Sequence, residues 1–530
     1  MTGRETERSG ARPGTGRLFG VGVGPGDPGL MTVKAVDLIR AADVVAYHCA
    51  RHGRSNARRI AAEYLGTQIE EALTYPVTTE SAEDYQGLID AFYTEAAARL
   101  AAHLDAGRDV VVLSEGDPFF YGSYMHLHKR LAHRYAAEVV PGVTSVSAAA
   151  ATLGTPLVER DEVLTVLPGT LPPDVLARRL ADTDSAAVMK LGRTFTGVRT
   201  ALRTAGRAEE ARYVERASQA EERQGRLEEI DPASVPYFSV GIVPSRVHVA
   251  TTEQARADGV LRKSNALSAC SPDSAGKSSA RDATSSTGLV TVVGLGPGSR
   301  DRLTPEAFSA LTAADDVVGY TTYVARVPHN PRQKVHGSDN KVESERAAFA
   351  LDLARSGRRV AVVSSGDPGV FAMASAVVEV AAEDYPDVEV RVLPGVTAAH
   401  AVAARIGAPL GHDYATISLS DRLKSWEVVE RRLAAVADAD MVIALYNPAS
   451  RSRTWQVEAA KEILLKYRDE STPVIIGRDV DGPEESVRVV ELGALVPAEI
   501  DMRTLLIVGS SQTRWVADRV FSPRRWPTAP

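Results

Sequence analysis

The sequence predicts an α/β protein built from two homologous modules, and three observations support this fold class. Short apolar segments alternate with helical segments, as in proteins with largely parallel sheets. A strand that leads through a glycine-rich loop into a helix occurs twice, at 18–32 and at 289–304. Two further motifs repeat in the same order in both halves of the chain, which indicates two whole modules and not a short-period repeat.

The first repeated motif is the glycine loop that follows the opening strand of each module. It reads Gly24-Pro25-Gly26 in the first module and Gly296-Pro297-Gly298 in the second, 272 positions later (296 − 24). Glycine permits positive φ angles and lets a ligand approach the backbone. Thr32 and Thr304 follow at positions that suit helix N-caps. A single copy of this loop is equally compatible with a tight turn.

The second repeated motif places a carboxylate directly after a strand. Gly116-Asp117-Pro118 follows the predicted strand at 109–113, and Gly366-Asp367-Pro368 follows the one at 359–363, an offset of 250 (366 − 116). The carboxyl ends of strands are where open α/β sheets bind ligands. One copy would fit an aspartate that caps a turn, whereas two copies in step with the glycine loop favour a functional site.

The third repeated motif is a Pro-Gly-Val-Thr turn before an alanine-rich helix. It occurs at 141–144 and at 394–397, an offset of 253 (394 − 141). Between the motifs, helices are predicted at 33–42 and 83–104, and strands at 43–47, 164–167, 186–189 and 237–243. The predicted organisation is a tail (1–16), a first module (17–250), a serine-rich linker (251–288), a second module (289–514) and a tail (515–530).

Composition narrows the class of protein. The 530 residues are 44% hydrophobic and 24% charged, as in ordinary globular proteins, and the net charge of −7 with no basic run argues against nucleic acid as the main partner. No apolar run is long enough to span a bilayer, and the first 16 residues lack the apolar core of a secretory signal, which predicts a cytosolic protein. Two isolated cysteines, Cys49 and Cys270, form neither a metal cluster nor a disulfide framework.

Taken together, these motifs resemble the tetrapyrrole methylases, S-adenosylmethionine-dependent enzymes with two α/β lobes around a cleft. The resemblance covers nearly the whole chain except the tails and the linker. Within that family, the first module's motifs, with 114–123 and 141–145, resemble the precorrin-2 C(20)-methyltransferases. The second module's motifs, with 319–323, 364–371 and 444–450, resemble the precorrin-3B C(17)-methyltransferases. The resemblance therefore implies a bifunctional enzyme of cobalamin synthesis whose C17 step includes ring contraction.

The resemblance also implies which residues line each site. No catalytic residue and no metal site is assigned, because methyl transfer from a sulfonium is a displacement that needs positioning more than a strong base. For S-adenosylmethionine, the first module would supply Gly24, Pro25, Gly26, Gly116, Asp117, Pro141, Gly142, Thr144, Met189 and Tyr237. The second would supply Gly296, Pro297, Gly298, Gly366, Asp367, Pro394, Gly395, Thr397, Tyr446, Asn447 and Thr504. The basic residues expected to face the tetrapyrrole carboxylates are Arg51, Arg54, Arg58, Arg326, Arg332, Lys334 and Arg453.

Other interpretations stay open at this point. An RNA-modifying or RNA-binding member of the same fold should carry a basic stripe, and the sequence has none. A dinucleotide-binding oxidoreductase needs an acidic residue at the end of the second strand, but Asp43 and Asp315 precede that strand in the two modules. Whether the substrate carries cobalt, and whether the two modules pair within one chain or in a homodimer, is not predicted.

Overall fold

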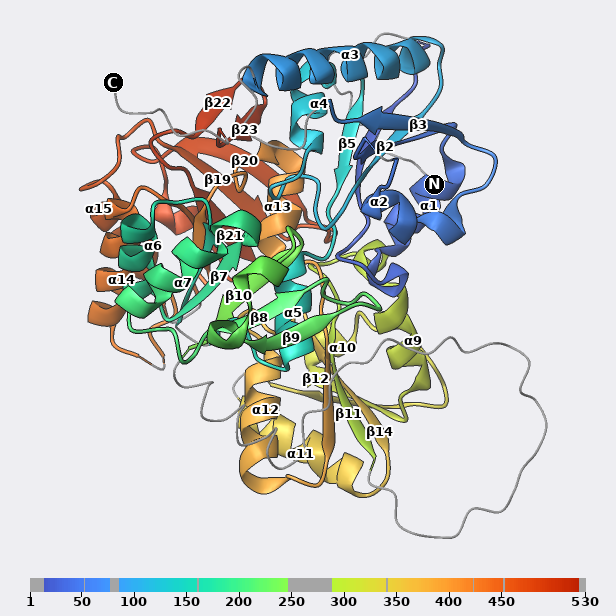
Figure 1. Ribbon diagram of the computed structural model, residues 1–530. Helices are drawn as coiled ribbons and strands as arrows, with labels where there is room; N and C mark the ends of the chain where they lie inside the picture. Colours follow the sequence, from blue (N-terminus) through green and yellow to red (C-terminus); the bar gives the residue numbers. More distant parts are fainter. Residues whose placement is uncertain are drawn as a thin grey trace, which may run out of the picture. The chain divides into compact units, whose positions relative to one another are not determined.

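The computed structural model describes residues 14–51, 53–76, 85–159, 162–245, 288–339, 342–422, 424–450 and 453–523. Most of the predicted N-terminal tail and linker, with Cys270, lies outside these residues. By their contacts the residues form two compact units (Figure 1). Unit 1 contains residues 1–144, 399–412 and 512–530, and unit 2 contains residues 145–398 and 413–511. Each module therefore contributes to both units.

Unit 1 holds a five-stranded sheet made by the first module. All its pairings are parallel, in the order β3-β2-β4-β1-β5, with Leu18 opposite Val110. The elements are β1 (Leu18–Gly22), α1 (Val33–Ala41), β2 (Val44–Cys49), α2 (Asn56–Ile60), β3 (Ile69–Thr74), α3 (Tyr85–Asp105), β4 (Val110–Ser114), α4 (Tyr124–Leu131) and β5 (Ala137–Val140). The central strands β1 and β4 are buried along their whole length, as is typical of strands covered on both faces.

Two segments from the C-terminal half complete unit 1. They are α13 (Ala398–Ile406) with β16 (Gly407–Ala408), and the hairpin β22 (Arg514–Val516) and β23 (Arg519–Phe521). Strand β16 pairs in parallel with β23, which pairs antiparallel with β22. Strands thus occupy part of the segment predicted as the C-terminal tail.

Unit 2 contains the equivalent five-stranded sheet of the second module. The order β13-β12-β14-β11-β15 and the parallel pairings repeat those of unit 1. The elements are β11 (Leu289–Gly294), α9 (Pro305–Ala313), β12 (Asp316–Tyr320), α10 (Thr321–Val324), β13 (Lys334–Ser338), α11 (Glu343–Arg355), β14 (Arg359–Ser364), α12 (Met373–Asp384) and β15 (Glu389–Leu393). Helices α11 and α12 pack on one face of this sheet and α9 on the other (Figure 1).

A ten-stranded sheet in unit 2 joins the second lobes of both modules. Its order is β20-β19-β21-β18-β17-β6-β7-β10-β8-β9. The first module provides α5 (Ser145–Leu153), β6 (Val163–Pro168), α6 (Pro173–Ala181), β7 (Ser185–Met189), α7 (Phe195–Thr204), β8 (Arg212–Glu215), β9 (Arg223–Arg226) and β10 (Ser239–Val243). The second provides β17 (Tyr414–Ser418), α14 (Trp426–Asp438), β18 (Val442–Tyr446), α15 (Gln456–Leu464), β19 (Pro473–Arg478), β20 (Ser486–Glu491) and β21 (Thr504–Val508).

The two modules meet in this sheet at β6 and β17. These strands pair antiparallel, with Val163 opposite Ile417 and Val166 opposite Tyr414. Helices α6, α7, α14 and α15 lie together over the sheet and share one apolar core with it (Figure 1). The modules are therefore joined within one chain by main-chain hydrogen bonds and a common core.

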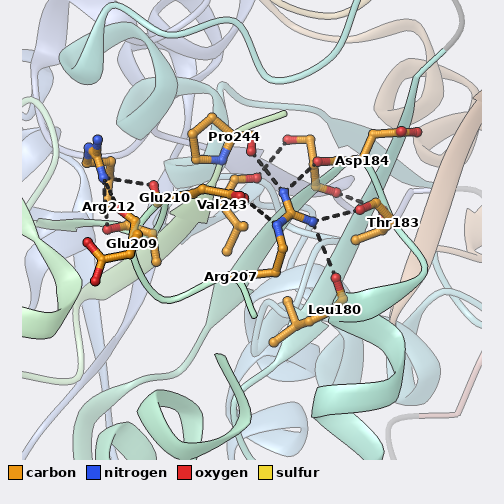
Figure 2. Close-up of polar contacts among 11 residues, drawn as sticks. Leu180, Thr183, Asp184, Arg207, Glu209, Glu210, Arg212, Val243 and Pro244 are labelled. Carbon is orange, nitrogen blue, oxygen red and sulfur yellow. Dashed lines mark hydrogen bonds and ion pairs between the residues drawn. The ribbon is translucent and has the colours of Figure 1, made fainter. Parts of the chain in front are cut away.

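In each second lobe a buried arginine bonds to several main-chain carbonyl groups. Arg207 is 5% exposed. As Figure 2 shows, it donates to the carbonyl oxygens of Leu180, Thr183, Asp184 and Pro244. In the second module Arg468 donates to the carbonyl oxygens of Ala437 and Met441. Because these contacts satisfy carbonyl groups inside the lobes, both arginines are structural residues.

Candidate functional site

The predicted motifs of the first module meet at one edge of the unit 1 sheet. Gly24 and Gly116 form an antiparallel bridge, and the Gly116 N–H donates to the Gly24 carbonyl at 2.8 Å. A Cβ atom on Gly22 would lie 2.6 Å from the Gly116 oxygen and 2.7 Å from the Gly142 nitrogen. Any larger residue would separate the three loops, so glycine is required there by the close approach of backbone.

The second module repeats this arrangement within unit 2. The Gly366 N–H donates to the Gly296 carbonyl at 2.8 Å. A Cβ atom on Gly294 would lie 2.8 Å from both the Gly366 oxygen and the Gly395 nitrogen. Thr304 accepts a hydrogen bond from the Ala307 N–H at 3.2 Å, as Thr32 does from Ala35. The predicted N-caps are thus confirmed in both modules.

The two motif aspartates point into their own loops. Asp117 accepts from the N–H groups of Phe119 at 2.8 Å and Gly142 at 3.1 Å. Asp367 accepts from Gly369 at 2.9 Å and Gly395 at 3.1 Å. Their side chains are buried, so each carboxylate ties the Gly-Asp-Pro loop to the Pro-Gly-Val-Thr turn. The geometry supports a positioning role for both aspartates, and their contact with the cofactor stays a prediction.

The glycine before each aspartate has open space on the side where a side chain would lie. Gly116 and Gly366 have φ angles of +68° and +67°, which favour glycine. A Cβ atom on Gly116 would meet nothing closer than 4.0 Å, and one on Gly366 nothing closer than 3.8 Å. The backbone of these loops can therefore be approached closely by a ligand, which fits a site for the adenosine or methionine part of the predicted cofactor.

The predicted second-lobe residues differ in their surroundings. Within unit 2, the Tyr446 ring packs at 5.1 Å on Phe371, at the end of the Gly-Asp-Pro loop. Asn447 has a left-handed backbone and donates to the Ser418 hydroxyl. Thr504 donates to Asp501 in its own turn at 2.8 Å. Met189 ends β7, and Tyr237, before β10, is 64% exposed.

The predicted substrate-binding cations separate into three groups. Arg51, Arg54, Arg332 and Lys334 are exposed. Arg58 forms a bidentate ion pair with Glu70, and the buried Arg453 donates to the carbonyl oxygens of Leu419 and Asn447. Arg326 is bonded to a glycine loop, donating to the Gly296 carbonyl at 2.8 Å and to the Ser365 hydroxyl at 3.0 Å. A small pocket beside Arg326 is lined by Leu295, Gly298, Ser299, Arg300 and Leu303.

Sequence analysis missed an ion pair that joins the two lobes of the second module. Arg302 donates from Nε to the Asp481 carboxylate at 3.1 Å, and both side chains are almost fully buried. A Cβ atom on Gly298 would lie 2.6 Å from the Asp481 backbone. By the offset of the glycine loops, the first module has Leu30 where the second has Arg302 (302 − 272 is 30). No local sequence signal links residues 179 positions apart.

Glu115 is a further residue that the sequence analysis did not predict. It occupies the variable position of the first module's Ser-x-Gly-Asp-Pro motif, and its side chain is hydrogen-bonded to Asn56 of α2. Burial raises the pKa of its carboxyl to about 7, and Asn56 and the nearby Arg59 counteract this only in part. A carboxyl group that titrates near neutrality is typical of functional sites, although structural groups share the property.

The raised pKa predicts how Glu115 affects stability with pH. The ordinary pKa is 4.5, so the folded protein holds this proton to higher pH than the unfolded chain. The resulting stabilisation is present below pH 4.5 and is lost as the pH rises to about 7, an effect of about 3 kcal/mol. Glu115→Gln carries no charge, so its melting temperature should rise relative to the wild type across that range. If the difference in melting temperature between the variant and the wild type did not change with pH, the raised pKa of Glu115 would be contradicted.

Comparison with known proteins agrees with the arrangement of motifs. The chain matches the model of the Tetrapyrrole (Corrin/Porphyrin) Methylases twice, over residues 17–231 and 289–496. The cobalamin biosynthesis protein CobIJ of Mycobacterium tuberculosis (strain ATCC 25618 / H37Rv) is 55% identical over 526 residues, which cover 97% of each chain. A crystal structure of the methyltransferase CobJ, 48% identical, covers 44% of this chain and 100% of its own, with a TM-score of 0.44.

Two shorter relatives each match about half of the chain. The precorrin-2 C(20)-methyltransferase of Sinorhizobium sp is 51% identical over 236 residues, 44% of this chain and 96% of its own. The precorrin-3B C(17)-methyltransferase of Sinorhizobium sp is 48% identical over 246 residues, 45% of this chain and 97% of its own. With the family model matched in both modules and a relative similar over almost the full length, the chain belongs to the tetrapyrrole (corrin/porphyrin) methylase family.

Proposed function

We propose that this methylase is bifunctional and acts twice in cobalamin synthesis. The first module, 17–250, methylates C20 of precorrin-2 or its cobalt form. The second, 289–514, methylates C17 of precorrin-3B or its cobalt equivalent, with ring contraction. The observation that supports this best is the 55% identity to CobIJ over 97% of both chains. The separate matches to a C20 and a C17 methyltransferase support the division into two activities.

S-adenosylmethionine is the proposed methyl donor, and its sulfonium supplies an electrophilic methyl carbon. The fit rests on the open approach to the backbone at Gly116 and Gly366 and on the three loops gathered around each of them. The proposed role of each module is to hold donor and tetrapyrrole in line and to exclude water. Asp117 and Asp367 keep the loops in register, and Tyr446 borders the second module's site through Phe371.

Arg326 is the proposed contact of the second module with a tetrapyrrole carboxylate. Its Nε is buried, with no hydrogen-bond partner among the residues that the structure describes. Burial lowers the pKa of its guanidinium, yet the group stays charged at neutral pH. The remaining predicted cations are proposed only as weaker contacts, because they are exposed or already bonded.

Two binding sites for the cofactor product are expected per chain. Calorimetric titration of the full chain with S-adenosylhomocysteine should give a stoichiometry of two, because both modules keep all three loops. Methyl incorporation should then be measured with precorrin-2, precorrin-3B and their cobalt forms side by side. A stoichiometry of one, or methyl transfer to neither substrate class, would overturn the proposal.

A further inference from the structure

The Gly-Asp-Pro loop of the second module is bonded to a segment of the first module. In unit 2, the N–H groups of Leu157 and Val158 both lie 3.1 Å from the Gly369 carbonyl, and the Phe371 N–H donates to the Val158 carbonyl at 3.0 Å. Val158 and Val370 form a parallel bridge. Leu157 and Val158 follow helix α5 of the first module, so first-module backbone holds the loop that contains Asp367.

Helix α5 also contacts Asp367 itself. The Ser147 hydroxyl donates to the Asp367 carboxylate, and Ser147 is only 4% exposed. The space around this contact is lined by Ser147, Ala150, Thr155, Asp367, Gly369 and Pro394 and has room for about one water molecule. Burial raises the pKa of Asp367 to about 6, against the three hydrogen bonds that favour its charged form. Ser147 is the side chain that supplies one of these three bonds.

The second module makes an equivalent contact with the first module. Helix α13 of the second module lies in unit 1, where the His400 ring packs at 5.0 Å on Phe120. Phe120 belongs to the first module's own Gly-Asp-Pro segment. By the offset of the Pro-Gly-Val-Thr turns, His400 corresponds to Ser147 (400 − 147 is 253). Each module's helix after that turn therefore contacts the other module's loop.

We propose that Ser147, a residue of the first module, is a positioning residue for the second module's site. It acts through Asp367, whose carboxylate also fixes the Gly395 N–H and hence the second Pro-Gly-Val-Thr turn. This inference rests on the proposed division of activities between the modules. It goes beyond that division, because it makes one activity depend on a side chain in the other module.

The experiment compares Ser147→Ala with Thr152→Val in the full-length chain. Both residues are buried on α5, but the Thr152 hydroxyl donates at 2.9 Å to Glu222 in the first module's own second lobe. Ser147→Ala is expected to lower C17 methylation three- to tenfold and to change C20 methylation less than twofold. The pH dependence of the C17 reaction should shift upward, because the charged form of Asp367 loses a donor. Thr152→Val should leave C17 methylation and its pH profile unchanged.

Hydrogen exchange separates this inference from the proposed function. Peptides that contain Gly369 and Gly395 should exchange faster in Ser147→Ala than in the wild type, whether or not a substrate is turned over. Faster exchange with a selective C17 loss supports the positioning role. Unchanged exchange of these peptides, or a loss confined to C20 methylation, overturns it. If the wild type methylates neither substrate, the proposed function fails while the exchange result still decides the inference.

Discussion

Replacing Asp367 with alanine is expected to lower methylation by the second module about ten- to a hundredfold, or about 1.4–2.8 kcal/mol in transition-state free energy. The substitution removes the acceptor of two buried N–H groups, at Gly369 and Gly395. An unsatisfied buried donor costs about 1–3 kcal/mol, so the loop and the turn should shift away from their paired arrangement. Methyl incorporation with the second module's substrate measures the loss.

Matched variants make this result specific. Asp117→Ala should impair C20 methylation to a similar degree and spare C17, since Asp117 makes the equivalent contacts in the first module. Asp367→Asn keeps one acceptor oxygen and turns an amide NH₂ toward the other N–H group, so its loss should be intermediate. If Asp367→Ala abolished C20 methylation and left C17 methylation intact, the assignment of loops to activities would be wrong.

Cutting the chain between residues 250 and 288 is expected to leave the two halves bound to each other. Strands β6 and β17 pair near the centre of a ten-stranded sheet, and residues of both halves fill the core beneath it. Arg179 forms an ion pair with Asp413 across the same junction, as does Arg432 with Asp184. Co-expressed halves should therefore co-purify and retain both activities.

Each half expressed alone should self-associate or aggregate. An isolated half would expose β6 or β17 as a new edge strand, which can pair with another chain, together with apolar core residues that the other half covers. Size-exclusion chromatography with light scattering measures the state of each half, and the co-expressed pair is the control. A monodisperse monomeric half that unfolds cooperatively would show that the intrachain sheet is dispensable.

Among the residues that the structure describes, no helix is long and apolar enough to cross a membrane. No group of three or more His, Cys, Asp or Glu side chains in that part of the chain could hold a metal ion.

The sequence by itself determined the local structure of each module. Continuous apolar runs specified the buried parallel strands, and Thr32 and Thr304 specified where the next helices begin, because these signals depend only on neighbouring residues. The three repeated motifs predicted which loops meet at the end of each sheet. Left-handed φ angles favour glycine at Gly116 and Gly366, so these residues could be singled out from the sequence.

Only the tertiary structure decided how the parts combine. The pairing of β6 with β17 depends on main-chain hydrogen bonds. Because every residue except proline has both a main-chain donor and an acceptor, the sequence does not show which strand pairs with which. The contact of Ser147 with Asp367 likewise joins residues of different modules, because α5 of the first module lies beside the second module's Gly-Asp-Pro loop. The fold also decided the surroundings of single side chains. Desolvation by burial raises the pKa of Glu115, and Glu70 on β3 is the ion-pair partner of Arg58 on α2.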